Sequence, residues 1–174
     1  MAKILEGDSY GQGLRLGIVV SRFNEFVTRS MLDGALNELR RAPVREADIT
    51  VVWVPGAREI PVAGLKLVEN EKPDAIIALG CIIRGETSHY EHIAQSVSDG
   101  IQRVALEKKV PVGFGVLTVE TMEQAMERAG GKFGNRGRDT ARSALEMARL
   151  VQLLEDESEK EKTLERLIED ELKR

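Results

Sequence analysis

Cysteine is almost absent from this sequence of 174 residues, which contains only Cys81. A lone cysteine excludes a disulfide within the chain. Cys81 lies inside an apolar run, where a free thiol is usually a buried packing residue whose pKa rises rather than falls. The GxSxG pattern occurs only at Gly7–Gly11, before the first predicted strand, whereas in serine hydrolases this motif lies between a strand and a helix. We therefore expect no covalent enzyme intermediate.

Long apolar runs are also missing. No segment approaches the roughly 20 apolar residues that a helix needs to cross a bilayer. The first residues, Met1 to Asp8, lack the apolar centre of a signal peptide. We expect a cytoplasmic protein with no membrane partner.

The sequence has no excess of positive charge. It contains 25 Lys and Arg against 29 Asp and Glu, a net charge of -4. Residues 155–174 hold nine of the acids and five of the bases, so residues 1–154 are formally neutral. A neutral domain offers no basic surface to a phosphate backbone, and we expect no nucleic-acid partner.

Histidine is scarce, with only His89 and His92. They lie three residues apart on a predicted helix, without the HExxH spacing and without an evident third ligand, so we expect no metal site. The glycine-rich segment 129–138 carries three cations but does not have the spacing of a phosphate-binding P-loop. Taken alone, it is typical of a flexible connection between two helices with solvated charges.

Short apolar runs rich in branched residues alternate with longer helical patterns along the chain. The runs are 14–20, 49–54, 75–83 and 110–118, and the helical patterns are 26–41, 60–70, 89–108, 121–129 and 139–154. This alternation predicts βαβ units. We expect one α/β domain over residues 1–154, a three-layer sandwich with a four-stranded parallel flavodoxin-like sheet in the order 2-1-3-4. Residues 155–174 form a charged C-terminal helical tail, either docked on a neighbour or solvated and frayed.

Right-handed crossovers bring the carboxyl ends of parallel strands to one edge, where ligands bind. Polar loops follow the predicted strands at 21–24, 55–59, 84–89 and 119–121. Phe23 offers a ring that packs against a planar ligand or, as an equal alternative, covers its own helix. Glu59 offers a carboxylate to a polyol or an amide.

The segment 84–89 is the most informative of these loops. Gly85 permits a close turn, Thr87 and Ser88 offer hydroxyl groups, and a helix begins beside them. Free backbone N–H groups at a helix N-terminus favour a phosphate or carboxylate. His89 lies next to them and can exchange protons near neutral pH. The pattern indicates an anion site beside a proton carrier.

Six segments are similar to motifs of the lumazine synthases of riboflavin biosynthesis. They are Gly17–Asn24, Val54–Pro61, Ile83–Tyr90, Phe114–Thr118, Glu123–Gly130 and Gly134–Gly137. The resemblance covers roughly residues 4–154. It implies the condensation of 5-amino-6-(D-ribitylamino)uracil with 3,4-dihydroxy-2-butanone 4-phosphate to 6,7-dimethyl-8-ribityllumazine, with loss of phosphate and water and with no cofactor or metal.

The resemblance also implies a set of residues that bind the uracil substrate. They are Phe23, Asn24, Ala57, Arg58, Glu59, Cys81, Ile82, Ile83 and Phe114. Phe23 would stack on the pyrimidine, and the segment 57–59 would hold the ribityl chain. The segment 81–83 would line the ring through its backbone, and Phe114 would come from an adjacent subunit.

For the phosphate, the resemblance implies Gly85, Glu86 and Thr87, with Arg128 arriving from the adjacent subunit. His89 would transfer protons. Glu86 stands where the family often has a small residue, and we assign its contact to the backbone N–H because a carboxylate would repel phosphate.

Arg136 stands where the family commonly has lysine, which keeps the charge but replaces a point donor with a planar fork. A contribution of Arg136 to the site is therefore possible but not assigned. By the same resemblance the protein forms a homo-oligomer, a pentamer or an icosahedral capsid of sixty subunits, with active sites between subunits. Alternatives are an archaeal-type riboflavin synthase, or a non-enzymatic shell or ligand-binding protein on the same scaffold.

Overall fold

The structure is a computed structural model that describes residues 2–87 and 89–172, with the backbone alone for 164–172. Four strands form its main sheet: β1 (Leu16–Ser21), β2 (Ile49–Val54), β3 (Ala75–Ile83) and β4 (Val112–Val119). All neighbours pair in parallel, in the order β2-β1-β3-β4. The predicted parallel sheet and its strand order are confirmed.

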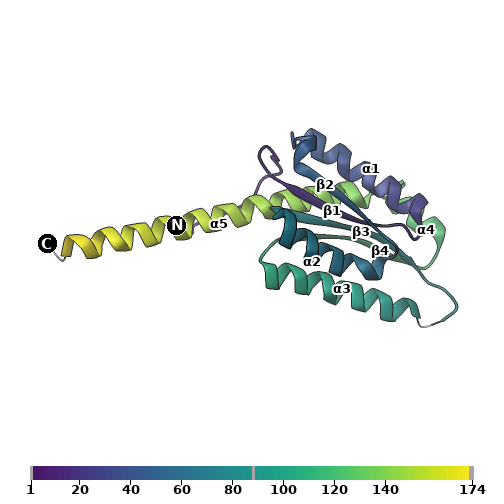
Figure 1. Ribbon diagram of the computed structural model, residues 1–174. Helices are drawn as coiled ribbons and strands as arrows, with labels where there is room; N and C mark the ends of the chain where they lie inside the picture. The colour runs from purple at the N-terminus through teal and green to yellow at the C-terminus, as the bar shows by residue number, and fades with distance from the viewer. Residues whose placement is uncertain (1, 88, 173–174) are drawn as a thin grey trace.

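Helices cover both faces of the sheet (Figure 1). One face carries α1 (Glu25–Arg41) and α5 (Arg136–Leu172), and the other carries α2 (Ile60–Glu71) and α3 (His89–Lys108). The short helix α4 (Met122–Arg128) follows β4, and 3₁₀ turns occupy Glu46–Asp48 (η1) and Ala57–Glu59 (η2). The predicted three-layer α/β sandwich is confirmed.

Two apolar cores lie on either side of the central strands. β3 is buried over almost its whole length, as expected for a parallel strand covered on both faces. Ile77 and Leu79 of β3 face the core under α1 and α5, whereas Ile76 and Ala78 face the core under α2 and α3. Alternate apolar side chains of β3 thus pack against the helices on the two faces of the sheet. The polar loops lie beyond the carboxyl ends of the strands.

Helix α5 crosses α1 at very short range. A Cβ atom added to Gly137 would lie 1.9 Å from the backbone oxygen of Met31, so only glycine fits at this crossing. Nearby, Arg142 of α5 donates from Nε to the carboxylate of Glu38 on α1 at 2.9 Å, and Glu38 is almost fully buried. Close backbone contact and one ion pair therefore fix the start of α5.

The glycine-rich segment is not a flexible connection. It forms an antiparallel hairpin of β5 (Ala129–Gly131) and β6 (Gly134–Asn135). The Asn135 side chain donates to the carbonyl oxygens of Ser30 and Ala129 at 2.9 and 3.2 Å and accepts from the Arg138 backbone N–H at 3.1 Å. These bonds join the hairpin to α1 and to the first turn of α5, which the sequence pattern did not predict.

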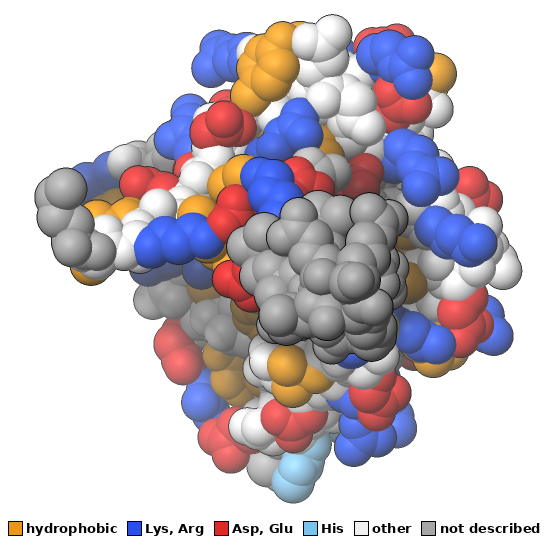
Figure 2. Space-filling view, turned by 90° about the vertical axis from the view of Figure 1, so that its left-hand side faces the viewer, with side chains coloured by type: hydrophobic (Ala, Val, Ile, Leu, Met, Phe, Trp, Pro, Cys, Tyr) orange, Lys and Arg blue, Asp and Glu red, His pale blue; other side chains and the backbone are white. Residues whose placement is uncertain are grey.

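The last predicted helix, 139–154, and the predicted helical tail form one continuous helix over the described residues. Helix α5 runs without a break from Arg136 to Leu172, so residues 155–172 continue it and project away from the sheet (Figure 1). No glycine or proline occurs between residues 138 and 172 to interrupt it. Figure 2 views the molecule from the side toward which α5 projects and shows acidic and basic side chains interspersed there. In the described part of the chain, no helix is apolar enough over a sufficient length to span a membrane.

Two helical glycines test the crossing of α1 and α5. Gly137→Ala should destabilise the protein by about 1–3 kcal/mol, because the new methyl group meets backbone that side chains cannot relieve. Gly64→Ala in α2 is the matched control. Its Cβ would lie 3.9 Å from the Ile76 side chain, an ordinary contact, so the gain in helix propensity should stabilise by about 0.5–1 kcal/mol. Urea unfolding at one protein concentration measures both, and equal stabilities would contradict the close crossing.

Candidate active site

A cavity of about 450 Å³ lies at the carboxyl edge of the sheet. Its walls come from the loop after β1, from η2, from the end of β3 and from the start of α3. The residues are Phe23, Gly56, Ala57, Arg58, Glu59, Cys81, Ile82, Ile83, Gly85, Thr87, His89, Tyr90 and Ile93. We call it the Phe23 pocket. It brings together most of the residues that the resemblance assigns to the uracil substrate and to the phosphate loop.

The loop that carries Phe23 is tied to the loop after β2. The backbone N–H groups of Arg22 and Phe23 donate to the carbonyl oxygens of Val54 and Pro55 at 2.8 and 3.0 Å. Phe23 lines the pocket and is 70% exposed, so most of its surface is accessible to a ligand. A flat ligand can stack on such a ring.

Asn24 and Glu59 organise the polar side of this edge. Asn24 adopts a left-handed backbone conformation at the start of α1, and its Nδ2 donates to the carbonyl oxygen of Cys81 at 3.0 Å. Glu59 is half-buried, and its Oε2 accepts the Gly56 N–H at 2.9 Å. This bond orients the Glu59 carboxylate within the pocket wall. Asn24, by contrast, is not among the residues that line the pocket.

Cys81 forms part of the wall and is 2% exposed. Burial raises the pKa of its thiol to about 11, so the side chain is a neutral packing group at physiological pH. The predicted burial of Cys81 and the predicted rise of its pKa are confirmed.

The loop after β3 places Gly85, Thr87 and His89 around the same cavity. His89 is the first residue of α3 and is exposed. Glu86 is exposed as well and is not among the lining residues, whereas Ser88 lies outside the described residues. The expected closeness of a glycine-containing loop, a helix N-terminus and a histidine is therefore present.

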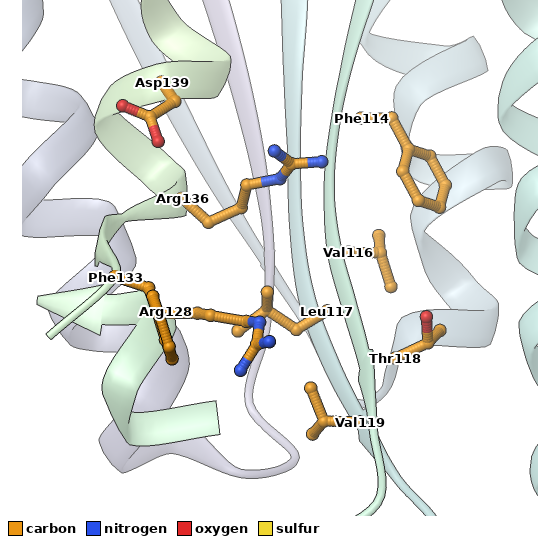
Figure 3. A pocket seen from close by; sticks show the side chains of 9 residues that line it. All are labelled: Phe114, Val116, Leu117, Thr118, Val119, Arg128, Phe133, Arg136 and Asp139. Atoms are coloured by element: carbon orange, nitrogen blue, oxygen red, sulfur yellow. The ribbon is translucent and has the colours of Figure 1, made fainter. Parts of the chain in front are cut away.

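A second cavity of about 460 Å³ lies between β4 and the first turn of α5 (Figure 3). Its lining residues are Phe114, Val116, Leu117, Thr118, Val119, Arg128, Phe133, Arg136 and Asp139. We call it the Arg128 pocket. The side chains of Arg128 and Arg136 extend from the ends of α4 and α5 toward β4, with Phe114 on the opposite side (Figure 3).

Arg128 is held by its own surroundings. Its Nη1 donates to the carbonyl oxygen of Gln124 at 3.0 Å, and its guanidinium carbon lies 5.2 Å from the ring centre of Phe133. The backbone N–H of Phe133 donates to the Glu127 carbonyl oxygen at 2.9 Å, which fixes the ring against α4. Sequence reasoning missed Phe133, because its place depends on the unpredicted hairpin.

The electrostatics of the Arg128 pocket favour an anion. Two guanidinium groups line it, and the positive end of the α5 dipole lies beside them, since α5 begins at Arg136. Asp139 partly offsets this charge and also lies 3.6 Å from Nε of Arg138.

The two pockets have no lining residue in common among the described residues. Phe114, Arg128 and Arg136 thus line a different cavity from the predicted residues of the Phe23 pocket within one protomer. A third hollow of about 580 Å³ between α1 and α4 contains none of the predicted site residues that the structure describes. Over residues 2–87 and 89–163, no three His, Cys, Asp or Glu side chains are grouped to hold a metal ion.

Residues 13–152 match the family model of 6,7-dimethyl-8-ribityllumazine synthase. This segment contains the complete main sheet and every residue that lines the two pockets. The chain therefore belongs to the 6,7-dimethyl-8-ribityllumazine synthase family, which comprises transferases of riboflavin biosynthesis.

Proposed function

We propose that this protein condenses 5-amino-6-(D-ribitylamino)uracil with 3,4-dihydroxy-2-butanone 4-phosphate to give 6,7-dimethyl-8-ribityllumazine, phosphate and water. The observation that carries the proposal is the Phe23 pocket, where an exposed aromatic ring, an oriented carboxylate, a glycine-containing loop and a histidine surround one cavity. Each group matches a part of the two substrates: a pyrimidine, a polyol chain, a phosphate and protons to be moved.

On the uracil side, Phe23 stacks on the pyrimidine and the segment 57–59 binds the ribityl chain, with Glu59 accepting hydroxyl hydrogens. The backbone at Cys81, Ile82 and Ile83 lines the ring. The buried state of Cys81 supports a backbone role, because its neutral thiol offers only a weak donor. Asn24 contributes by holding the carbonyl oxygen of Cys81 in place.

On the phosphate side, backbone N–H groups at Gly85, Glu86 and Thr87 bind the leaving phosphate. The Glu86 side chain is exposed and is therefore free to point away from the anion. Arg128 supplies the positive charge, and Arg136 adds to it. Both arginines line a pocket separate from the phosphate loop of the same chain, which supports a site completed by an adjacent subunit of a homo-oligomer.

The chemistry needs positioning and proton transfer. The amine of one substrate attacks the ketone of the other, water leaves as the imine forms, phosphate leaves by elimination, and ring closure releases a second water. Holding the two substrates together can supply effective molarities of about 10⁵ to 10⁸ M. His89 moves protons at the amine and at the leaving groups, which typically contributes about 10²- to 10⁴-fold.

Mixing the protein with both substrates and following lumazine absorbance and fluorescence tests the proposed reaction. We expect a rate well above that of the spontaneous condensation. A rate equal to the spontaneous one would exclude this activity, and conversion of added lumazine to riboflavin would instead indicate a riboflavin synthase. Binding of the substrates without turnover would indicate a ligand-binding or shell protein.

His89→Ala should reduce kcat by about 10²- to 10⁴-fold while leaving a rate above the spontaneous reaction, because positioning survives the loss of the imidazole. His92→Ala is the matched control, since His92 lies one turn further along α3 and is not among the residues that line the Phe23 pocket. Steady-state kinetics measures both variants. Equal losses would remove His89 from the proposed role.

Phe23→Ala and Arg128→Ala alter different pockets, so a site shared between subunits should allow them to complement each other. Each variant alone should have low activity, and Arg128→Ala should raise KM chiefly for the phosphate substrate. Co-expressed in equal amounts, they should restore intact sites at roughly a quarter of the interfaces of a head-to-tail ring. Activity no higher than the average of the two variants would place each site within a single chain.

Cys81 should resist alkylation in the folded protein. Because its pKa is raised to about 11, the reactive thiolate is a small fraction at pH 8 and grows as the pH rises toward that value. Iodoacetamide should therefore modify the native chain far more slowly than the urea-unfolded chain, as followed by mass spectrometry. If iodoacetamide modified Cys81 rapidly in the native protein and turnover were lost, Cys81 would not be an unreactive part of the pocket wall.

A further inference from the structure

Arg84 joins three elements at the point where β3 ends. Its Nε lies 2.7 Å from the carboxylate of Glu120, and its Nη1 donates to Oε1 of Glu91 at 3.2 Å. The guanidinium carbon lies 4.7 Å from the ring centre of Tyr90. The Arg84 backbone N–H also donates to the carbonyl oxygen of Val119 at 2.9 Å. One residue thus contacts the end of β4 and the first turn of α3 together.

These contacts hold the residues at both ends of the phosphate loop. The loop begins directly after Arg84 and leads into α3, whose second and third residues are Tyr90 and Glu91. The loop has little packing of its own at Gly85, because a Cβ atom added there would meet nothing within 4 Å. Its course therefore depends on how its two ends are held.

Arg84 is poorly suited to bind the substrate phosphate itself. Its donors are directed at Glu120 and Glu91, which balance its charge and raise its pKa. It is not among the residues that line the Phe23 pocket, although its neighbours Ile83 and Gly85 are. Single exposed ion pairs contribute little, but here two carboxylates and one ring meet the same planar group.

We propose that Arg84 is a positioning residue for the reaction: through Glu120, Glu91 and Tyr90 it holds the phosphate loop and the start of α3 in the geometry that places Thr87 and His89 around the substrate. This inference rests on the proposed function of the Phe23 pocket. The link to Glu120 also connects the loop to the segment before α4, the helix that carries Arg128 at its end.

Steady-state kinetics of Arg84→Ala and Arg84→Lys tests this role. Arg84→Ala should lower kcat/KM by about 10- to 100-fold, because displacements near 1 Å can have effects of this size. KM for the phosphate substrate should rise more than KM for the uracil substrate. Arg84→Lys should recover part of the loss, since an ammonium group pairs with one carboxylate but does not bridge two. Arg103→Ala is the control. It removes an exposed ion pair between Arg103 and Glu107 of α3 and should leave kcat/KM and both KM values unchanged.

Inorganic phosphate provides a readout without turnover. Arg84→Ala should bind it about tenfold more weakly by calorimetry than the wild-type protein. Glu120→Gln should also weaken phosphate binding and lower kcat/KM, but less than Arg84→Ala does. The Arg84→Ala/Glu120→Gln double variant should lose no more phosphate affinity or kcat/KM than Arg84→Ala alone. Lower thermal stability with unchanged phosphate affinity and unchanged KM values would overturn the positioning role. Failure of the wild-type protein to make lumazine would instead refute the proposed function, while the phosphate titration would still decide whether Arg84 shapes the anion site.

Discussion

Parallel pairing of the four strands is the constraint on which the candidate site depends. Because β1, β2, β3 and β4 run in one direction, their carboxyl ends meet at one edge, and residues as distant in sequence as Phe23 and His89 surround one cavity. The apolar alternation within β3 supports both helical layers. The polar residues of the Phe23 pocket are thereby brought to that edge.

The Arg128 pocket depends on a different contact, the close approach of α5 to α1. Gly137 permits that approach, and Asn135 bonds the hairpin to α1, so that Arg128, Phe133 and Arg136 line one cavity. The residues of the proposed site are therefore divided between two separate pockets of the protomer. One pocket contains the Phe23 ring and the His89 imidazole, and the other contains the guanidinium groups of Arg128 and Arg136.

Sequence patterns predicted the sheet almost completely, because runs of branched apolar residues and their spacing are local properties. The start of α3 at His89 and the glycine-containing loop before it followed from local signals as well. The hairpin did not, because it is held by contacts between Asn135 and Ser30 that no short window contains. The role of Phe133 was missed for the same reason. The continuation of α5 past Leu154 was predictable in principle, since nothing in its sequence breaks a helix.

The projection of α5 also separates electrical charge. Residues 1–154 are formally neutral, whereas residues 155–172, the last described part of a 37-residue helix, contain nine acids and three bases. The negative end of the helix dipole points the same way. The protein is therefore a long electric dipole, and copies whose tails lie side by side repel one another over a range that shrinks to about 10 Å at 0.1 M salt. Ionic strength thus governs how closely these tails approach.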